Sequence, residues 1–267
     1  MSGWRKYFMV AQLAVQEAAS YRLNHALSFL VAAVPLVALI LLWNAVFGPN
    51  TQLAGFSRGE ILTYFVLTRW LYELTGPTVW WEIRYEILEG DLVFHLLRPQ
   101  EYGLYHFALI VSSKLPYALT GLAVVAPFAW AVGAGWVWPP SLSAWLAFAL
   151  SVLVAITLGY AFTFLFSLSA FWLEENTAVN LLADYVVPLA AGALLPLSLL
   201  PGPLAALLTR LPFAKLLYFP AQVYLGQVEG TAFWAGLGEQ LAWLAGLAAL
   251  NAWVWRRGLR RFRAVGG

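Results

Sequence analysis

The chain has 267 residues, of which 62% are hydrophobic and 10% are charged, and its formal net charge is +2. A soluble domain is about 45–50% apolar and about 25% charged, so this composition excludes an ordinary soluble protein and predicts an integral membrane protein. The absence of cysteine excludes disulfides, thiolate metal ligands and cysteine nucleophiles.

Residues 1–24 predict an amphipathic helix that lies at the membrane surface. Trp4, Phe8 and Val15 fall at helical spacing on one face, whereas Arg5 and Gln12 lie on another. A helix that combines cationic and aromatic residues ahead of the first span suits the membrane interface. The alternative is an ordinary cytoplasmic helix packed on the loops. The charges in this stretch and the lack of a cleavage site argue against a cleavable signal peptide.

Six membrane spans are expected, since a helix needs about 20 apolar residues to cross the bilayer core. The uncharged run 115–173 is too long for one crossing, and "GAGWVWPPS" in its middle supplies the glycine and proline typical of a turn. The predicted spans are residues 26–47, 61–81, 105–132, 142–172, 178–200 and 233–255. The whole chain is then one transmembrane domain: an interfacial helix (1–24), a six-span bundle (25–255) and a basic tail (256–267).

The distribution of basic residues predicts that both termini are cytoplasmic. Five arginines follow the last span in "RRGLRRFR", and cytoplasmic loops carry the excess of lysine and arginine. With this orientation ten basic residues lie on the cytoplasmic side and three lie on the outer side, the three being Arg58, Arg210 and Lys215.

Two connections stand out in this topology. Residues 82–102 form the longest inner loop, whereas the other inner loop, "LEENTA", is short and acidic. Residues 201–232 form the longest outer segment, which is apolar and contains four prolines. Short or re-entrant helices are expected there, because irregular backbone is tolerated at membrane depth only where protein or water covers it.

Charged residues inside spans are costly and tend to face the interior of a bundle. Arg69 and Glu73 are spaced i, i+4 in the second span and are expected to pair. The pair either lines a substrate path or subunit seam, or is structural and allows the span to hold both charges. Lys114, near the start of the third span, is expected to extend its ammonium group to the inner interface.

No motif on the chain predicts catalysis, a cofactor or a metal. The phosphate-binding pattern G-x-x-x-x-G-K-[ST] and the G-x-S-x-G elbow are both missing from the sequence. The three histidines, His25, His95 and His106, show no metal-ligand spacing. A nucleic-acid reader is not expected either, because the basic tail follows a membrane span and anionic lipid headgroups are its natural counterpart.

Three local motifs and the span pattern resemble the permease subunits of ABC-2 type exporters, most closely the daunorubicin or multidrug export branch. The motifs are "EGDLVFHLLRP" (89–99), "LPFAKLLYFPAQVYLG" (211–226) and "WRRGLRRFRAVGG" (255–267). With the spans, the resemblance covers nearly the whole chain. It implies an all-α permease in the bacterial cytoplasmic membrane that exports a drug, lipid or other amphiphile.

The resemblance also implies partners. Such permeases carry no ATPase, so ATP and Mg²⁺ are bound by a separate pair of cytosolic subunits, and two permeases, identical or not, complete the transporter. A coupling element in the first inner loop, here within residues 82–98, receives the push of the ATPase.

Residues 82–91 have the side chains that such docking needs. Ile83 and Ile87 share a helical face and are expected to present an apolar edge. Gly90 is expected to end one helix and Asp91 to cap the next, and Arg98-Pro99 should end the second piece. The charged contacts expected in this loop are Glu82, Arg84, Glu86, Glu89 and Asp91. The alternative is a solvated loop whose charges only keep it out of the lipid.

Two other functions remain open. A gradient-driven carrier or channel commonly has internal repeats and several buried carboxylates, whereas Glu73 is the one deep acidic group expected here and no repeat relates the two halves. A membrane-embedded lipid-modifying enzyme needs a nucleophile beside a base, and residues 82–102, which include His95, lack a convincing pair.

Overall fold

The computed structural model describes residues 8–13, 15–16, 27, 34, 37–39, 41–47, 52–53, 55–76, 80–114, 116, 121, 135–175 and 177–262. Within these ranges the chain is almost entirely helical, so the predicted all-α class is confirmed. The strands found there are β1 (Gln52–Leu53) and β2 (Phe56–Ser57), which pair antiparallel with Leu53 opposite Phe56. Gly55, at a φ of 85°, supplies the left-handed residue of their tight turn.

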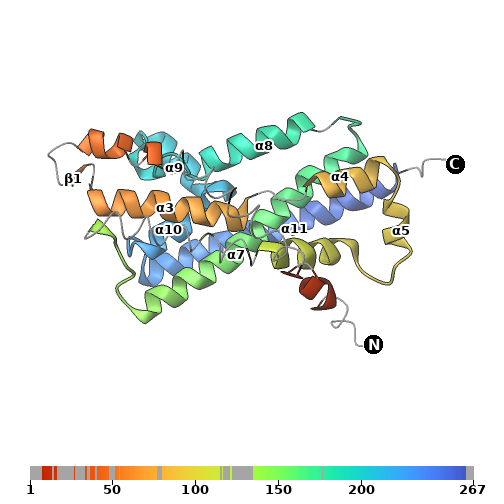
Figure 1. Ribbon diagram of the computed structural model, residues 1–267, viewed down its shortest axis with the longest axis horizontal. Helices are drawn as coiled ribbons and strands as arrows, with labels where there is room; N and C mark the ends of the chain where they lie inside the picture. Colours follow the sequence, from red (N-terminus) through yellow and green to blue (C-terminus); the bar gives the residue numbers. More distant parts are fainter. Residues whose placement is uncertain are drawn as a thin grey trace.

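Long helices run side by side along the longest axis of the molecule (Figure 1). The central one is α7 (Leu142–Ser167), which continues as the 3₁₀ turn η2 (Leu168–Phe171) and packs against α3 (Arg58–Thr75) and α11 (Gly230–Leu259). In the described ranges, one helical stretch, Leu142–Phe171, is long and apolar enough to cross a membrane by length and composition. It coincides with the predicted span 142–172, whereas the total of six spans stays a prediction.

The second predicted span, 61–81, has the wrong bounds. A capping box fixes its start earlier: Ser57 Oγ accepts from the Glu60 amide at 3.2 Å, and the Glu60 carboxylate accepts from the Ser57 amide at 2.7 Å. The helix ends at Thr75 because Gly76 is extended, with ψ at 159°, as expected for a residue that precedes a proline. Residues 80 and 81 belong to the next helix, α4 (Trp80–Leu88).

The fifth predicted span, 178–200, is not one continuous helix. Its helix, α8 (Thr177–Ala190), has 14 residues and is about 21 Å long, less than the roughly 30 Å of a bilayer core. Gly192, with φ at 88°, turns the chain just beyond the end of α8. The short 3₁₀ turn η3 (Leu197–Leu199) follows.

The outer segment agrees with expectation, and the last predicted span lies within a single helix. Residues 201–232 contain the short helices α9 (Gly202–Arg210), η4 (Pro212–Lys215) and α10 (Tyr218–Tyr224). The sixth predicted span, 233–255, lies within α11, which is longer at both ends. The first two arginines of the basic tail, Arg256 and Arg257, are therefore still helical.

Two polar side chains of α11 form hydrogen bonds with the backbone of α7. Gln240 Nε2 donates to the Ser151 carbonyl at 3.0 Å, and Asn251 Nδ2 donates to the Ala161 carbonyl at 2.9 Å. Both amides are buried. In an apolar setting such bonds hold two helices in one register, because an unpaired amide is costly there.

Three predicted elements lie partly outside the described residues. The N-terminal helix 1–24 is described as helical at 8–13 and 15–16, and the first span, 26–47, is described chiefly at 41–47. The third span, 105–132, is described as part of a helical segment that begins at 102 and is continuous through 114.

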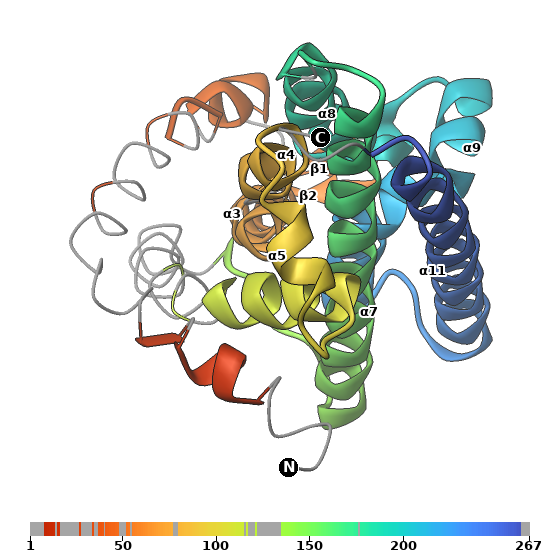
Figure 2. The same ribbon diagram turned by 90° about the vertical axis from the view of Figure 1, so that its right-hand side faces the viewer.

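The connections separate into two groups at opposite ends of the molecule. The helix α4, the short helix α5 (Leu92–Leu96), the link between α7 and α8, and the C-terminal end of α11 gather at one end, whereas β1 and α9 lie toward the other (Figure 1). Seen along the long axis, α4 and α5 lie beside α7 and the helical segment that follows them (Figure 2). The longest predicted inner loop thus shares one end with the other predicted inner loop.

Candidate functional site

The predicted coupling segment folds as two short helices joined by a sharp turn. Gly90 has a φ of 88° and separates α4 from α5, as the sequence predicts. Asp91 occupies the N-cap position of α5, but its side chain makes no capping hydrogen bond, so that prediction is wrong. Its own backbone is helical, with φ at −63° and ψ at −17°, whereas a capping side chain normally needs the extended region. The second piece, α5, ends at Leu96, ahead of Arg98-Pro99 as expected.

Ile83 and Ile87 do not present an apolar edge to a partner, and this correction changes the expected docking face. Their exposed fractions are 0% and 5%. Together with Leu92 they belong to an internal apolar cluster that also contains residues of η2 and α7, among them Leu168 and Phe164. The amphipathic face that the sequence indicates is therefore covered by this chain itself.

The charged residues of the segment face in different directions. Glu82, Glu89 and Asp91 are exposed. Arg84 is directed toward the α7–α8 link, where its Nη2 lies 3.3 Å from the Glu174 carbonyl oxygen and 3.4 Å from Glu175 Oε2. The two predicted inner loops are thus in direct contact.

Exposed apolar side chains on and after α5 were not predicted as site residues. Phe94 is 62% exposed and Leu97 is 78% exposed, and Leu96 is exposed as well. The sequence signal was available in "LVFHLLRP", but nothing in that pattern separates a buried apolar position from an exposed one. These residues follow Glu89 and Asp91, whose side chains are exposed, within a few positions along the chain.

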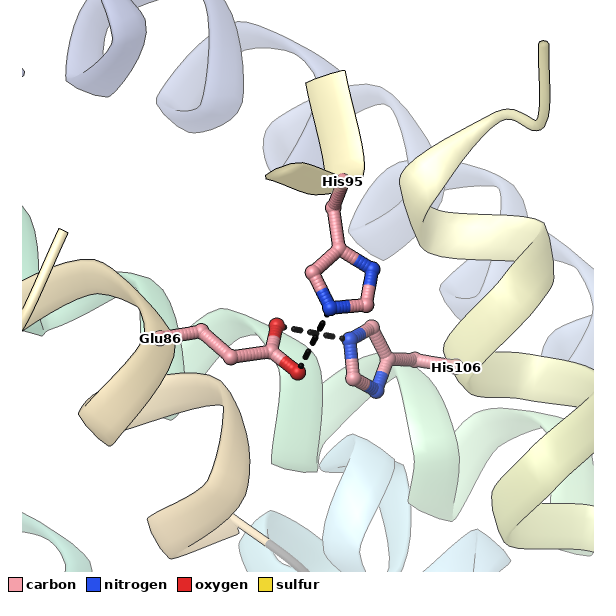
Figure 3. Close-up of side chains that lie close together, drawn as sticks. All are labelled: Glu86, His95 and His106. Atoms are coloured by element: carbon pink, nitrogen blue, oxygen red, sulfur yellow. Dashed lines mark hydrogen bonds and ion pairs between the residues drawn. The ribbon is translucent and has the colours of Figure 1, made fainter. Parts of the chain in front are cut away.

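Glu86 points inward and receives three contacts. Tyr102 donates its hydroxyl to Glu86 Oε2 at 2.5 Å, and His106 Nε2 lies 3.1 Å from the same oxygen. His95 Nε2 lies 3.2 Å from Oε1, so both imidazoles face one carboxylate (Figure 3). His106 is 1% exposed, and its Nδ1 has no hydrogen-bond partner among the described residues. The prediction that Glu86 offers its charge to a partner does not fit this placement.

Burial and neighbouring charge shift the pKa values of this cluster in opposite directions. Burial acts to raise the pKa of Glu86, but the contacts with His106, Tyr102 and His95 outweigh it, and the net effect is a lowered pKa. Burial lowers the pKa of His95, although the Glu86 carboxylate opposes the shift. Burial, followed by the adjacent Glu86 charge, raises the pKa of Tyr102. Tyr102 is therefore a neutral donor to an ionised carboxylate at neutral pH.

Tyr102 links this cluster to the last helix. Its ring stacks on Trp255 of α11, with centroids 4.7 Å apart and planes inclined by 11°. Trp255 also lies 5.8 Å from the ring of Phe171 in η2. The segment of α4, α5 and the following helix is thus packed onto both α7 and α11.

The comparisons with known proteins agree with this architecture. A family model described as an ABC-2 family transporter protein matches residues 33–266. The chain belongs to the ABC-2 transporter family. Comparison with curated protein sequences gives no match. Members of this family are membrane components of transporters, usually the permeases of ABC exporters, and they generally act with an ATP-binding subunit.

Membership confirms the resemblance drawn from the three motifs, since the matched range includes the first two and all but the last residue of the third. It makes this ABC-2 protein a transport component of a membrane. The daunorubicin-like branch stays a prediction.

The pair predicted between Arg69 and Glu73 of this ABC-2 protein is present. Arg69 donates through Nη2 to Glu73 Oε1 on the same face of α3, and both side chains are partly exposed. The Arg69 guanidinium also lies over the ring of Tyr72, 5.6 Å from its centroid. Whether the pair lines a path or is structural stays open.

Lys114 does not extend to the interface. It is buried, and its Nζ donates to the carbonyl oxygens of Leu74 at 2.8 Å and Gly76 at 2.7 Å. The break before Pro77 leaves carbonyls at the C-terminal end of α3 without helical donors. Lys114 supplies the donors that these carbonyls need, and the negative end of the helix dipole favours its charge.

Proposed function

We propose that this chain is the permease subunit of an ATP-driven exporter in the bacterial cytoplasmic membrane. Six spans place both termini in the cytoplasm, and two permeases, identical or not, join two cytosolic ATPases. ATP and Mg²⁺ are bound by those ATPases. The cargo is a drug, lipid or other amphiphile, as in the export permeases that the motifs resemble.

The observation that carries this proposal is the match of residues 33–266 to the ABC-2 family. The arrangement of the connections supports it. The two predicted inner loops contact each other through Arg84 and Glu175, and they share one end of the molecule with the last turn of α11 (Figure 1). A single cytosolic partner that approaches this end can reach α4, α5 and the α7–α8 link together.

The surface proposed for docking combines exposed apolar and acidic side chains. Phe94 and Leu97 provide the apolar part, and Glu82, Glu89 and Asp91 provide the acidic part. Large apolar anchors inside a polar rim are typical of protein interfaces. This surface replaces the docking surface predicted from Ile83, Ile87 and Glu86, because those three side chains point into the protein.

The inward residues supply the mechanical connection to the membrane domain. A push on α4 and α5 acts on Ile83, Ile87 and Leu92, which are buried against η2 and α7. It also acts on Tyr102, which is stacked on Trp255 of α11. Because packed interiors have low compressibility, displacement of the docked helices is passed to both long helices.

Reversal of two exposed charges tests the docking surface. The double substitution Glu89→Lys and Asp91→Lys is expected to weaken association with the ATPase that co-purifies with the wild-type chain by at least about tenfold. Reversed interface charges commonly cost more than about 1.4 kcal/mol. The measurement is the amount of ATPase retained per permease after purification, together with the transport-coupled ATPase rate in liposomes.

Glu229→Lys is the matched control, because Glu229 is an exposed acidic residue that begins α11 at the opposite end. It should leave assembly unchanged. Glu86 is not used, since its loss would disturb the histidine contacts and confuse misfolding with lost docking. Full assembly and normal coupling in the double variant would contradict docking through this surface.

A further inference from the structure

Three side chains from three different elements converge at the buried side of the coupling segment. Glu86 comes from α4, His95 from α5, and His106 from the helical segment 102–114, and their polar ends face one another (Figure 3). One nitrogen or oxygen atom of each residue lies within 4.8 Å of the corresponding atoms of the other two. We propose that Glu86, His95 and His106 form a binding site for a divalent cation of the zinc class.

The chemistry of the three side chains selects the class of ion. Two imidazoles and one carboxylate are a set that zinc accepts, with an open fourth position for water. Calcium and magnesium prefer oxygen ligands, so a set with two nitrogens disfavours them. Cobalt(II) and nickel(II) share the preference for imidazole, which makes cobalt(II) a usable spectroscopic substitute.

The spacing of the atoms fits a tetrahedral ion. Ligand atoms about 2.0–2.2 Å from zinc, at the tetrahedral angle, are about 3.4 Å apart. The His95 Nε2 to Glu86 Oε1 distance is 3.2 Å, and the His106 Nε2 to Glu86 Oε2 distance is 3.1 Å. Each imidazole thus lies at a ligand-to-ligand distance from one carboxylate oxygen, and one ligand atom of each of the three residues lies within 4.8 Å of those of the other two.

The surroundings orient two of the three ligands. Tyr102 donates to Glu86 Oε2, which fixes the carboxylate in the way that an outer hydrogen bond orients a metal ligand. The ring of Tyr102 also lies 4.5 Å from that of His106. Such packing limits the rotamers of the imidazole and reduces the entropy lost when an ion binds.

One feature limits the affinity. Binding through Nε2 places the ring proton of His106 on Nδ1, which has no acceptor among the described residues. Loss of such an outer partner typically costs about 10–100-fold in metal affinity. We therefore expect a site that is weaker than a fully supported zinc centre, by about that factor.

A bound ion would join α4, α5 and the helical segment 102–114 at one point. These are the elements on which the proposed docking acts, and a cross-link between them would make them move as one unit. Metal binding itself is measured on the isolated chain without an ATPase. Failure of the metal site and failure of the proposed transport function are therefore distinguishable.

The test uses the full-length chain purified in detergent without a polyhistidine tag and stripped with a chelator. Titration with Co²⁺ should give the visible absorption of a tetrahedral site with one ion per chain, and Zn²⁺ should displace it. His95→Gln and Glu86→Gln are each expected to weaken Co²⁺ binding by at least about 100-fold. The reason is that the loss of a metal ligand lowers the affinity more than the loss of an outer hydrogen-bond partner does. His25→Gln removes the one histidine outside the site and should leave binding unchanged.

His95→Cys separates a metal ligand from a merely structural histidine. Cysteine ligates Co²⁺ and Zn²⁺, so this variant should bind Co²⁺ and add a sulfur-to-cobalt charge-transfer band in the near ultraviolet. No other cysteine is present in the chain to produce that band. The proposal is overturned if the wild-type chain binds no Co²⁺ or Zn²⁺, or if His95→Gln binds as the wild type does. It is likewise overturned if the His95→Cys chain shows no such band although its thermal unfolding transition shows that it is folded.

Discussion

Replacing Gly159 by alanine is expected to destabilise the protein by about 2 kcal/mol. Gly159 lies in α7 where that helix crosses the end of α3, and a Cβ atom there would lie 2.1 Å from the Thr75 carbonyl oxygen. The obstacle is backbone, so no flexible side chain can move aside. So close an approach to backbone belongs at the upper end of the about 1–3 kcal/mol that overpacking costs. Subtracting the roughly 1 kcal/mol that alanine gains over glycine in a helix leaves about 2 kcal/mol.

Gly246→Ala is the matched control. Gly246 also lies within a long helix, α11, but a Cβ atom there has no neighbour within 4 Å among the described residues. Only the gain in helix propensity remains, so this variant should be as stable as the wild type or slightly more stable. The two substitutions are chemically identical and are expected to shift stability in opposite directions.

The measurement is the midpoint of thermal unfolding in detergent, followed by tryptophan fluorescence and by the monodisperse fraction after heating. Gly159→Leu should lower the midpoint further than Gly159→Ala. If Gly159→Ala unfolds at the wild-type temperature while Gly246→Ala behaves as expected, α3 and α7 do not pack as closely as the structure has them. Small residues at helix crossings in membranes are commonly retained for such close approach.

Sequence reasoning succeeded where one local signal dominates. The uniform apolar run of α7 and the glycine at position 90 each allow one interpretation, and the structure agrees with both. The prolines of 201–232 likewise predict short helices, which are found. It failed at the ends of the second and fifth spans. There apolar composition continues past the residues at which Gly76 and Gly192 turn the backbone.

At the candidate site, prediction from the sequence fails for a different reason. Ile83 and Ile87 share a helical face that the sequence identifies as apolar, but the prediction that this face is presented to a partner is wrong. The sequence does not tell whether the cover is a partner or the same chain, because both are apolar surfaces. Leu168 and Phe171, which cover it here, are about 80 residues away along the chain, and only the tertiary structure brings them close.

The histidine cluster could not have been found from spacing. Metal motifs are recognisable when ligands lie within one turn or a short loop, whereas Glu86, His95 and His106 come from three elements. The turn at Gly90 redirects the chain from α4 into α5 at one end of the molecule, and the helical segment that begins at 102 then runs back along the long axis (Figure 1). These two changes of direction bring His95 and His106 to the same carboxylate.

Replacing Lys114 by methionine is expected to lower the free energy of unfolding by about 3 kcal/mol. Methionine keeps much of the volume but removes both donors to the Leu74 and Gly76 carbonyls. Each buried carbonyl that loses its partner costs about 1–3 kcal/mol. Both carbonyls stand at the C-terminal end of α3, where helix carbonyls have no intrahelical donor, and Pro77 has no backbone N–H to supply one.

An opposing effect sets the upper limit of this loss. Removing a buried ammonium group also removes its desolvation cost, which is several kcal/mol for an isolated charge. In the wild-type chain that cost is offset by two short hydrogen bonds and by the negative end of the α3 dipole. Lys114→Gln tests the balance, because it keeps N–H donors without a charge, and an intermediate stability is expected.

Ser113→Ala is the control for the same stretch of helix. Its hydroxyl donates to the Ile110 carbonyl at 2.9 Å, within one helical segment, so its loss should cost less than about 1 kcal/mol.

Thermal unfolding in detergent compares the stabilities of the variants. A Lys114→Met chain as stable as the wild type would mean that the C-terminal end of α3 finds other donors. An equal loss in Ser113→Ala would mean that the segment is sensitive to any change. In the expected order Lys114→Met is much less stable than Lys114→Gln, and Ser113→Ala is close to the wild type. That order would identify Lys114 as the residue that stabilises the break between α3 and α4.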